Sequence, residues 1–272
     1  MHIKIIVCYH KESVVYNNDV YLPMHLGKAI SNKDLGIMGD DTGDNISELN
    51  PYFNETTGIY WAWKNLKDCD YVGLCHYRRY FLFDERKDNF QFEYITNDEE
   101  FSTLSFNSQR LEELLCGCDV VLTRKVRYTT SILKLYNKMH GVETMKALRD
   151  AVNALYPDYI PSYDRLMKSN RTPRCNMFIA KKSVFDDFCS WYFAILFKLY
   201  NEAKKLKLDL DKPRKIAFLS EILMPVYYLQ NEKNLKINYL PIAVINPEKK
   251  RISNLRYILS GLKSQIKYYL SY

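Results

Sequence analysis

The sequence predicts an α/β protein whose central sheet is mostly parallel and is flanked by helices. Two short segments, IKIIVCYH (3–10) and YVGLC (71–75), are almost entirely apolar, which is typical of strands buried on both faces of a parallel sheet. The segment 184–206 has apolar residues at helical spacing and is long enough to form a major helix. Because such strands and helices alternate along the chain, we expect one sheet that is covered on both faces.

The remaining elements follow from the same patterns. A loop rich in Asn, Asp and Gly should follow the first strand, with GDDTGDNIS (39–47) as its densest part. Further strands are predicted at 119–126, 175–181 and 235–245, and further helices at 55–68, 109–118 and 216–230, with one or two more over 129–168. Pro225 should bend its helix, and the polar segment 84–108 should be a loop. We expect one domain over 1–248 and a separate tail over 249–272.

The net charge of +7 is concentrated in that tail. Residues 249–272 contain six Lys and Arg and no acid, so residues 1–248 carry a net charge of only +1. Apolar residues of the tail recur at helical spacing opposite this basic face, a pattern typical of a helix that lies on anionic lipid. A helix that packs on the domain or pairs two copies is the alternative. The nearly neutral domain argues against a nucleic-acid partner.

The cellular location is predicted from what the chain lacks. No secretory leader and no apolar run of about 18 residues is visible, and the seven cysteines are scattered without a CxxC pair. We therefore expect a cytoplasmic protein with reduced thiols, held on the inner face of the cell membrane by its tail.

Three predicted strands end in basic and aromatic residues, namely Tyr9-His10-Lys11, His76-Tyr77-Arg78-Arg79 and Thr123-Arg124-Lys125. Ligands of open α/β sheets bind at the carboxyl ends of the strands, and arginine grips phosphate with two hydrogen bonds at once. Each terminus alone would be explained by exposure to solvent. Together they favour an anionic ligand such as a diphosphate.

The candidate carboxylates are less sharply defined. Asp40, Asp41 and Asp44 lie in the Gly/Asn loop, where they could bind a metal, a sugar hydroxyl or nothing. The DxD at 209–211 lies in a Lys-rich connector, which favours a solvated loop. Glu221 interrupts an otherwise apolar helix face, and buried acids are rare without a partner, so it is either part of an internal ion pair or functional.

Several common enzyme signatures are missing. The chain has no GxGxxG, GxxxxGK[ST], GxSxG or HExxH motif, which argues against dinucleotide-binding dehydrogenases, P-loop NTPases, α/β-hydrolases and zinc peptidases. The five histidines show no spacing typical of metal ligands.

Six strings of the sequence resemble one bacterial family. They are, in chain order over about residues 2–245, HIKIIVCYHK, GDDTGDNIS, ETTGIYWAWKN, YVGLCHYRRYF, CNMFIAKKSVFDDFCSWYFAILF and FLSEIL. They are similar to the capsular and exopolysaccharide-biosynthesis glycosyltransferases formerly labelled a domain of unknown function (DUF4422-type). The resemblance implies a single GT-A-like, that is Rossmann-like, domain and a transferase that depends on a nucleotide sugar.

The resemblance also implies where the donor binds. The end of the first strand, Tyr9, His10 and Lys11, would contact the nucleotide. Further donor-binding candidates are Asp41, Asp44, Asn45 and Asn176, the last because CNMFIAKK resembles a strand of glycogenin-like and lipopolysaccharide galactosyltransferases whose Asn lies near the sugar.

A departure from the wider fold concerns the metal. A strand in the position of YVGLC normally ends in a DxD that holds Mn²⁺ on the diphosphate, whereas this chain has His76, Tyr77 and Arg78 there. We hypothesise that Arg78 and Arg79 stabilise the departing diphosphate instead; a Mn²⁺ or Mg²⁺ ion stays an open alternative. Because adjacent side chains of a regular strand point to opposite faces, at most one of the two arginines should reach the phosphate.

The candidate catalytic residues are Glu221, Arg78 and His76. Glu221 falls where related enzymes place an acid close to the reacting centre, either as the general base of an inverting transfer or as an acceptor-binding group in a retaining one. The expected reaction is transfer of a hexose, galactose by resemblance, from a UDP-linked donor to a lipid-linked oligosaccharide in capsule, exopolysaccharide or O-antigen synthesis. The missing DxD favours the alternative, a non-catalytic nucleotide-sugar-binding or scaffold protein of a polysaccharide assembly complex.

Overall fold

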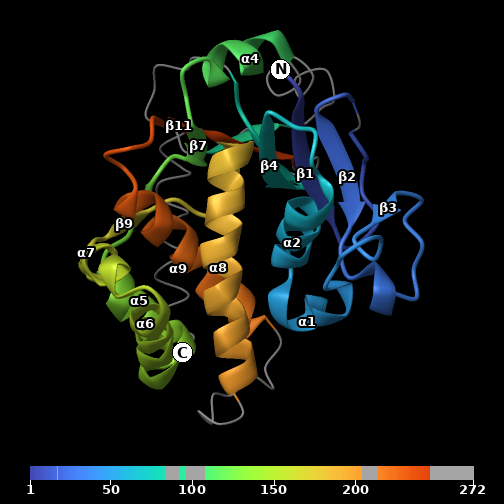
Figure 1. Cartoon of the computed structure of the whole chain (residues 1–272). Coiled ribbons are helices and arrows are strands. Elements are labelled where there is room, and N and C mark those ends of the chain that lie inside the picture. The colour runs from blue at the N-terminus through green and yellow to red at the C-terminus, as the bar shows by residue number, and fades with distance from the viewer. Residues whose placement is uncertain (17, 84–91, 96–107, 204–213, 246–272) are drawn as a thin grey trace.

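The structure is a computed structural model that describes residues 1–16, 18–83, 92–95, 108–203 and 214–245 (Figure 1). Its centre is a sheet whose main path has the order β11-β7-β10-β4-β1-β2-β3. The strands of this path are β1 (Ile3–Tyr9), β2 (Tyr21–His25), β3 (Met38–Gly39), β4 (Tyr71–His76), β7 (Val120–Thr123), β10 (Phe178–Lys181) and β11 (Ile237–Leu240).

All neighbours in this path are parallel except those of β10. β1 pairs in parallel with β2 and β4, β2 with β3, and β11 with β7, whereas β10 is antiparallel to both β4 and β7. The carboxyl ends of β1, β4 and β7 therefore lie at the same edge of the sheet, where ligands of such sheets bind.

Among the described residues, several helices cover one face of the sheet, and α4 (Ser108–Leu115) with additional strands covers the other. The helices are α1 (Asn50–Phe53), α2 (Thr56–Asn65), α4, α5 (Ile132–His140), α6 (Val142–Leu155), α7 (Ile160–Lys168), α8 (Lys182–Glu202) and α9 (Lys215–Gln230). Ile6 and Leu74 belong to a buried cluster that includes α2 and α5–α9, while Ile5 and Cys75 face a second cluster with α4. Because successive side chains of β1 and β4 point to opposite faces of the sheet, each strand contributes residues to both buried clusters.

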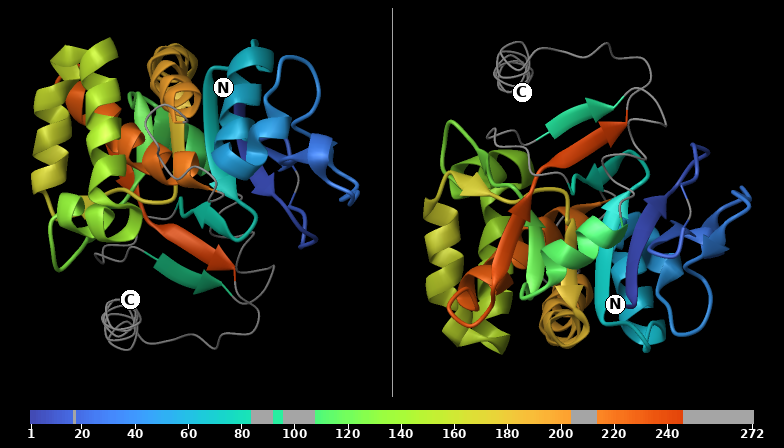
Figure 2. Two further views of the ribbon diagram at one scale, coloured as in Figure 1. Left: turned by 90° about the horizontal axis from the view of Figure 1, so that it is seen from below. Right: turned by 90° about the horizontal axis from the view of Figure 1, so that it is seen from above.

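Three strands lie off the main path, namely β5 (Arg79–Phe81), β6 (Phe92–Ile95) and β12 (Ile242–Ile245). β12 is antiparallel to β5 and parallel to β6, and Figure 2 shows β6 and β12 side by side. A separate small sheet pairs β8 (Val126–Arg127) with β9 (Arg171–Thr172).

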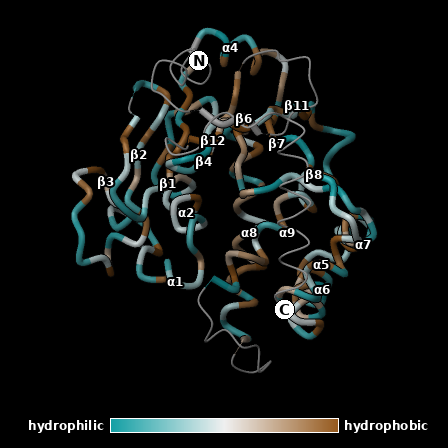
Figure 3. The backbone as a smooth tube through the Cα atoms, turned by 180° about the vertical axis from the view of Figure 1, so that it is seen from behind, coloured by the Kyte–Doolittle hydropathy of each residue, from teal (hydrophilic) through white to brown (hydrophobic). Residues whose placement is uncertain are grey.

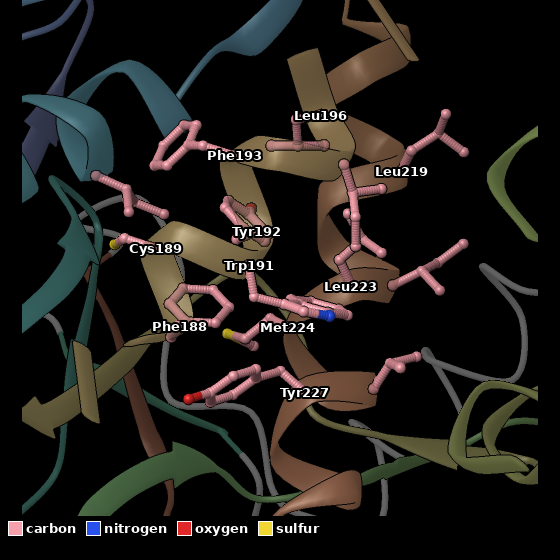
Figure 4. Close-up of a cluster of buried hydrophobic side chains, with 14 of the residues drawn as sticks. Phe188, Cys189, Trp191, Tyr192, Phe193, Leu196, Leu219, Leu223, Met224 and Tyr227 are labelled. Carbon is pink, nitrogen blue, oxygen red and sulfur yellow. The ribbon is translucent and has the colours of Figure 1, made fainter. Parts of the chain in front are cut away.

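The packing of α8 against α9 fixes the helix that carries Glu221. The ring of Tyr227 lies 5.2 Å from that of Phe188 and 5.5 Å from that of Trp191, measured between centroids, and Figure 4 shows these α8 side chains facing Met224 and Tyr227 of α9. Aromatic pairs at such distances add to the energy of area burial. In Figure 3, hydrophobic and hydrophilic positions alternate along α5 and α6, as expected for helices with one buried face.

The predicted fold class is confirmed: the chain forms an α/β fold with a mostly parallel central sheet flanked by helices. The strands predicted at 3–10 and 71–75 and the helix predicted at 184–206 correspond to β1, β4 and α8. The region 129–168 contains α5, α6 and α7, where one or two helices were expected.

Four predicted segments differ from the structure. The loop expected after the first strand contains β2 and β3; Pro23 is tolerated in β2 because β3 pairs only with Met24 and His25, next to it. The single strand expected at 235–245 is divided at Pro241 into β11 and β12, which pair with different strands. The strand expected at 119–126 ends at Thr123, before the short β8. The loop expected at 84–108 contains β6; its other residues before Ser108 lie outside the described ranges.

No helix within the described residues is long and apolar enough to cross a membrane. The tail 249–272 lies outside those residues, so its lipid-facing helix stays a prediction.

Candidate functional site

A cavity of about 390 Å³ lies at the carboxyl ends of β1 and β4. Its lining includes Tyr9 and His10 from the end of β1 and His76 from the end of β4. The charged side chains around it come from distant parts of the sequence and are Glu55, Arg78, Arg79, Arg174, Arg214 and Glu221. Four guanidinium groups and two carboxylates thus share one cavity.

The connection from β4 to β5 brings both adjacent arginines to the cavity. β4 ends at His76, Tyr77 and Arg78 form a turn, and Arg79 then pairs with His76 in antiparallel register. Because the strand does not continue through the arginines, the alternation expected of a regular strand does not apply, and both Arg78 and Arg79 line the cavity.

Tyr77 organises the basic residues at the ends of β1 and β4. Its backbone N–H donates to the carbonyl of Cys8 at 3.1 Å, which joins the two strand ends. The guanidinium carbon of Arg78 lies 4.8 Å from the centroid of the Tyr77 ring and Lys11 Nζ lies 5.9 Å from it, both at cation–π distance. The His10 ring meets the same ring edge-on at 5.3 Å. Three cationic or ionisable groups are therefore held around one buried ring.

The two carboxylates stand at helices that begin at the cavity. Glu55 is the residue that precedes the first turn of α2, and Glu221 lies on α9, whose N-terminal neighbour Arg214 also lines the cavity. The buried amide of Asn176 connects the two helices: its Nδ2 donates to Glu55 Oε1 and to Ser220 Oγ, both at 2.9 Å. Ser220 directly precedes Glu221, so Asn176 fixes both carboxylates relative to β10.

Glu221 has an altered acidity. Burial chiefly, and the neighbouring Glu55 carboxylate in addition, raise its pKa from the ordinary 4.5 to about 7, although Arg174 and Arg79 act in the opposite direction. Among the described residues Glu221 has no hydrogen bond or ion pair. The internal ion pair considered in the sequence analysis is therefore not formed with any of them. A carboxyl that titrates near neutral pH is suited to general acid–base work.

The two histidines of the cavity favour the neutral form. Burial lowers the pKa of His76, although Glu55 raises it in part, and its Nε2–H donates to the Cys175 carbonyl at 2.7 Å. Burial followed by the charges of Arg214, Lys11 and Arg78 lowers the pKa of His10. The positive charge of the cavity therefore comes from its arginines.

The backbone around the cavity is strained. In the described parts of the chain, four non-glycine residues have positive φ: Asn54 (45°), Cys175 (71°), Asn176 (50°) and Arg214 (74°). Asn54, Cys175 and Arg214 line the cavity, and Asn176 binds Glu55. Such conformations persist where the surroundings impose them and are typical of functional sites.

Other residues predicted for the site lie elsewhere. Asp41, Asp44 and Asn45 are outside the cavity lining, in a loop whose polar groups bond to one another: Tyr60 donates to Asp44 Oδ1 at 3.2 Å, and Asn45 Nδ2 donates to the Gly43 carbonyl at 3.0 Å. Asp40 is buried and accepts hydrogen bonds from the Ser47 and Thr57 hydroxyls, a structural role.

Two further features predicted from the sequence are not found at the cavity. The third basic strand end, Thr123-Arg124-Lys125, does not join the other two at this cavity, because Lys125 lines a different cavity. The DxD at 209–211 lies outside the described residues.

The side chains of the cavity indicate whether it is suited to hold a metal ion. Where related folds hold a metal with carboxylates, β4 here ends at His76 and is followed by Arg78 and Arg79. Within the described ranges no group of three or more His, Cys, Asp or Glu side chains is arranged to hold a metal ion. The four arginines among the described lining residues are groups of the kind that bind phosphate oxygens with paired hydrogen bonds.

Sequence reasoning missed Glu55, Arg174 and Arg214. Glu55 is the first residue of the predicted helix 55–68, and Arg174 directly precedes the predicted strand 175–181, which was a usable signal, because residues at such starts lie at an edge of the sheet. The left-handed conformations of Cys175 and Arg214 leave no mark in composition or spacing.

Comparisons with known proteins identify the family and the fold of the chain. The model of the family described as "Domain of unknown function (DUF4422)" matches residues 4–232, a range that includes all the cavity residues named above. The chain is also similar to the solved apo structure of the bifunctional glycosyltransferase WbbM, with 30% sequence identity and a TM-score of 0.83. That match covers 90% of this chain but 46% of the other, so this chain spans about half of its length. No curated protein matches the chain.

Proposed function

The chain belongs to the DUF4422 family and has a glycosyltransferase fold, and from this we propose that it is a glycosyltransferase that uses a nucleotide-diphosphate sugar. One observation carries the proposal: two carboxylates, one with a pKa of about 7, share a cavity with four arginines at the carboxyl ends of β1 and β4. This set supplies what such a transfer requires, a base for the acceptor and cations for the leaving diphosphate.

The arginines are assigned to the donor. Arg78 and Arg79 from the β4–β5 turn and Arg214 before α9 offer planar groups that bind phosphate oxygens with paired hydrogen bonds. As the bond between the sugar and the diphosphate breaks, negative charge grows on the diphosphate, and these fixed cations stabilise it. Tyr9 and His10 at the end of β1 are assigned to the nucleotide.

Glu221 is assigned to the acceptor as general base. Its ionised carboxylate takes the proton of the attacking hydroxyl while that oxygen bonds to the sugar carbon and the diphosphate leaves, which inverts the configuration at that carbon. Burial chiefly, and Glu55, which Asn176 holds, in addition, raise the pKa of Glu221, so that its ionised carboxylate is a stronger base than an ordinary one. His76 fixes the Cys175 carbonyl and so the strained turn before β10.

The finer assignment follows the sequence resemblance. We assign a hexose, with galactose as the first choice, a UDP-linked donor, and a lipid-linked oligosaccharide acceptor of capsule, exopolysaccharide or O-antigen synthesis, handled on the cytoplasmic side of the membrane. The structural similarity to an enzyme titled a bifunctional glycosyltransferase supports the general reaction.

A donor screen tests the proposal. We expect UDP-sugars to raise the melting temperature by mass action, and the best of them to be hydrolysed slowly in the absence of acceptor. Arg79→Gln should weaken UDP binding about 10-fold to 100-fold, because it removes charge-assisted hydrogen bonds, whereas Lys146→Gln on the exposed side of α6 should not. Donor binding without hydrolysis or transfer to any acceptor would instead assign the non-catalytic alternative, and no binding of any nucleotide sugar would refute both.

A second experiment addresses the cation. If arginines stabilise the diphosphate, hydrolysis of the donor should continue in excess EDTA at a rate close to that without it. The same assay with added Mn²⁺ or Mg²⁺ is the control for stimulation. Complete loss in EDTA that Mn²⁺ restores would show that a metal carries this role.

A further inference from the structure

A second cavity has a volume of about 260 Å³. Two segments of the chain contribute residues to both this cavity and the first. Arg171 lines the second cavity and Arg174 the first, which puts their backbones about 10 Å apart at strand spacing. On α9, Glu221 lines the first cavity and Pro225, one helical turn later, lines the second. Figure 1 shows β9 and α7 beside α9, on the side of the molecule away from β2 and β3.

The second cavity has an excess of positive charge. Among its described lining residues, Lys125, Arg165 and Arg171 are basic and Glu232 is the one acid. Glu232 pairs with Arg165 at 2.6 Å, so this carboxylate is engaged by one cation. Lys125 lies 5.0 Å from the centroid of the Tyr239 ring, at the apolar part of the lining that Leu166 and Leu229 complete.

Arg171, which lines this cavity, has a second arginine opposite it in the small sheet. In the β8–β9 pair, Arg127 is directly opposite Arg171, and both are exposed. The neighbouring pair, Val126 and Thr172, is buried and so points to the other face. Like charges directly opposite each other destabilise a strand pair, and among the described residues neither guanidinium has an ion pair or side-chain hydrogen bond. An anion between them would convert this repulsion into attraction.

We infer that the second cavity binds an anionic group, a phosphate or a carboxylate, of the acceptor, at Arg171 and Arg165, which line it, and at Arg127, which is opposite Arg171 in the β8–β9 pair. The apolar part of the lining with Tyr239 accommodates the body of the ligand. The backbone separation of the two cavities would be roughly 6–10 Å, by the helical rise from Glu221 to Pro225 and the strand rise from Arg171 to Arg174. The identification of the ligand as an acceptor rests on the proposed function, whereas the anion site itself does not.

Calorimetric titration of the full chain tests the site. Saturating UDP first occupies the cavity at β1 and β4, and inorganic pyrophosphate or glucuronate is then titrated, with glucose as the neutral control. We expect at least one of the two anions to bind, and Arg171→Gln to weaken that binding about tenfold or more. Glu232→Gln should tighten it severalfold, because Arg165 is released and a repelling carboxylate is removed. Lys146→Gln, the same loss of charge at a distance, should change nothing.

The outcomes separate the sources of the anion and the two proposals. Binding of pyrophosphate alone identifies the diphosphate of a carrier, and binding of glucuronate alone identifies an acidic sugar. No anion binding under UDP, or binding that neither Arg171→Gln nor Glu232→Gln alters, overturns the inference. If the wild-type protein binds no UDP but its pyrophosphate affinity still responds to both substitutions, the anion site stands and the donor assignment fails.

Discussion

Replacing Glu221 with Gln should lower kcat for sugar transfer by about 10²-fold to 10⁴-fold, the usual contribution of a general base. Gln keeps the size and polarity of the side chain but cannot accept the proton of the acceptor hydroxyl. KM for the donor should change little, because the arginines and the end of β1 are left intact. The measurement is steady-state kinetics with the best donor of the screen.

The pH profile provides an independent readout. With the pKa of Glu221 at about 7, the base is protonated below that pH, so kcat/KM should fall tenfold per pH unit under acidic conditions and level off above neutrality. In Glu221→Gln the residual rate should lose this acidic limb. Glu143→Gln, a substitution of an exposed acid at the start of α6, is the matched control. Near-normal kcat in Glu221→Gln, or an unchanged acidic limb, would remove Glu221 from the chemistry.

The same residue should affect stability in the opposite direction. A carboxyl whose pKa is higher in the folded protein than in the unfolded chain binds its proton more tightly when folded, so stability decreases as pH rises from about 4.5 to about 7. At pH 7.5, Glu221→Gln should therefore melt no lower than the wild type, since it removes a charge that the site disfavours. A variant that is inactive yet at least as stable distinguishes a functional role from a structural one.

Replacing Asn176 with Ala should cost about 2–3 kcal/mol of folding free energy and also lower kcat. The buried amide donates to Glu55 and Ser220, and its removal leaves a carboxylate oxygen without that donor and separates α2 from α9 at the cavity. Because Asn176 has a φ of 50°, Ala adds backbone strain to this loss. Chemical denaturation gives the free energy, and the kinetic assay gives kcat and KM.

Asn176→Gly is the matched control, because Gly adopts positive φ without strain but lacks the amide. We expect Gly to recover part of the stability lost in the Ala variant but none of the lost kcat. The acidic limb of the pH profile should also move, because Glu55 would no longer be fixed beside Glu221. A Gly variant with normal kcat and a normal pH profile would limit Asn176 to a structural role.

The sequence revealed the sheet better than its connections. β1 and β4 were identifiable because strands buried on both faces must be apolar throughout. β2 was not, because Pro23 and polar neighbours hide a strand near the edge. Pro241 lies within one apolar run, so nothing in the composition shows that the chain leaves one strand pairing there and enters another.

The candidate site was predictable where it lies on strand ends and obscure where it depends on turns. The basic ends of β1 and β4 follow directly from the motifs, and Glu221 was identifiable as an acid on an apolar helix. Glu55 and Arg174 approach Glu221 only through contacts between segments far apart in the sequence. The effect of Glu55 on the pKa of Glu221 is therefore a property of the fold that no local pattern encodes.

The starts of α2 and α9 at the cavity have an electrostatic consequence. The N-terminus of a helix carries about half a positive charge from its aligned peptide dipoles, and neither helix has a side-chain hydrogen bond that caps its first N–H groups. Two such partial charges add to the field of the arginines, and part of the attraction for a diphosphate therefore comes from the backbone. A substitution of a single arginine should therefore weaken donor binding only in part. The two helix N-termini would still attract the diphosphate, because their partial charges come from the backbone.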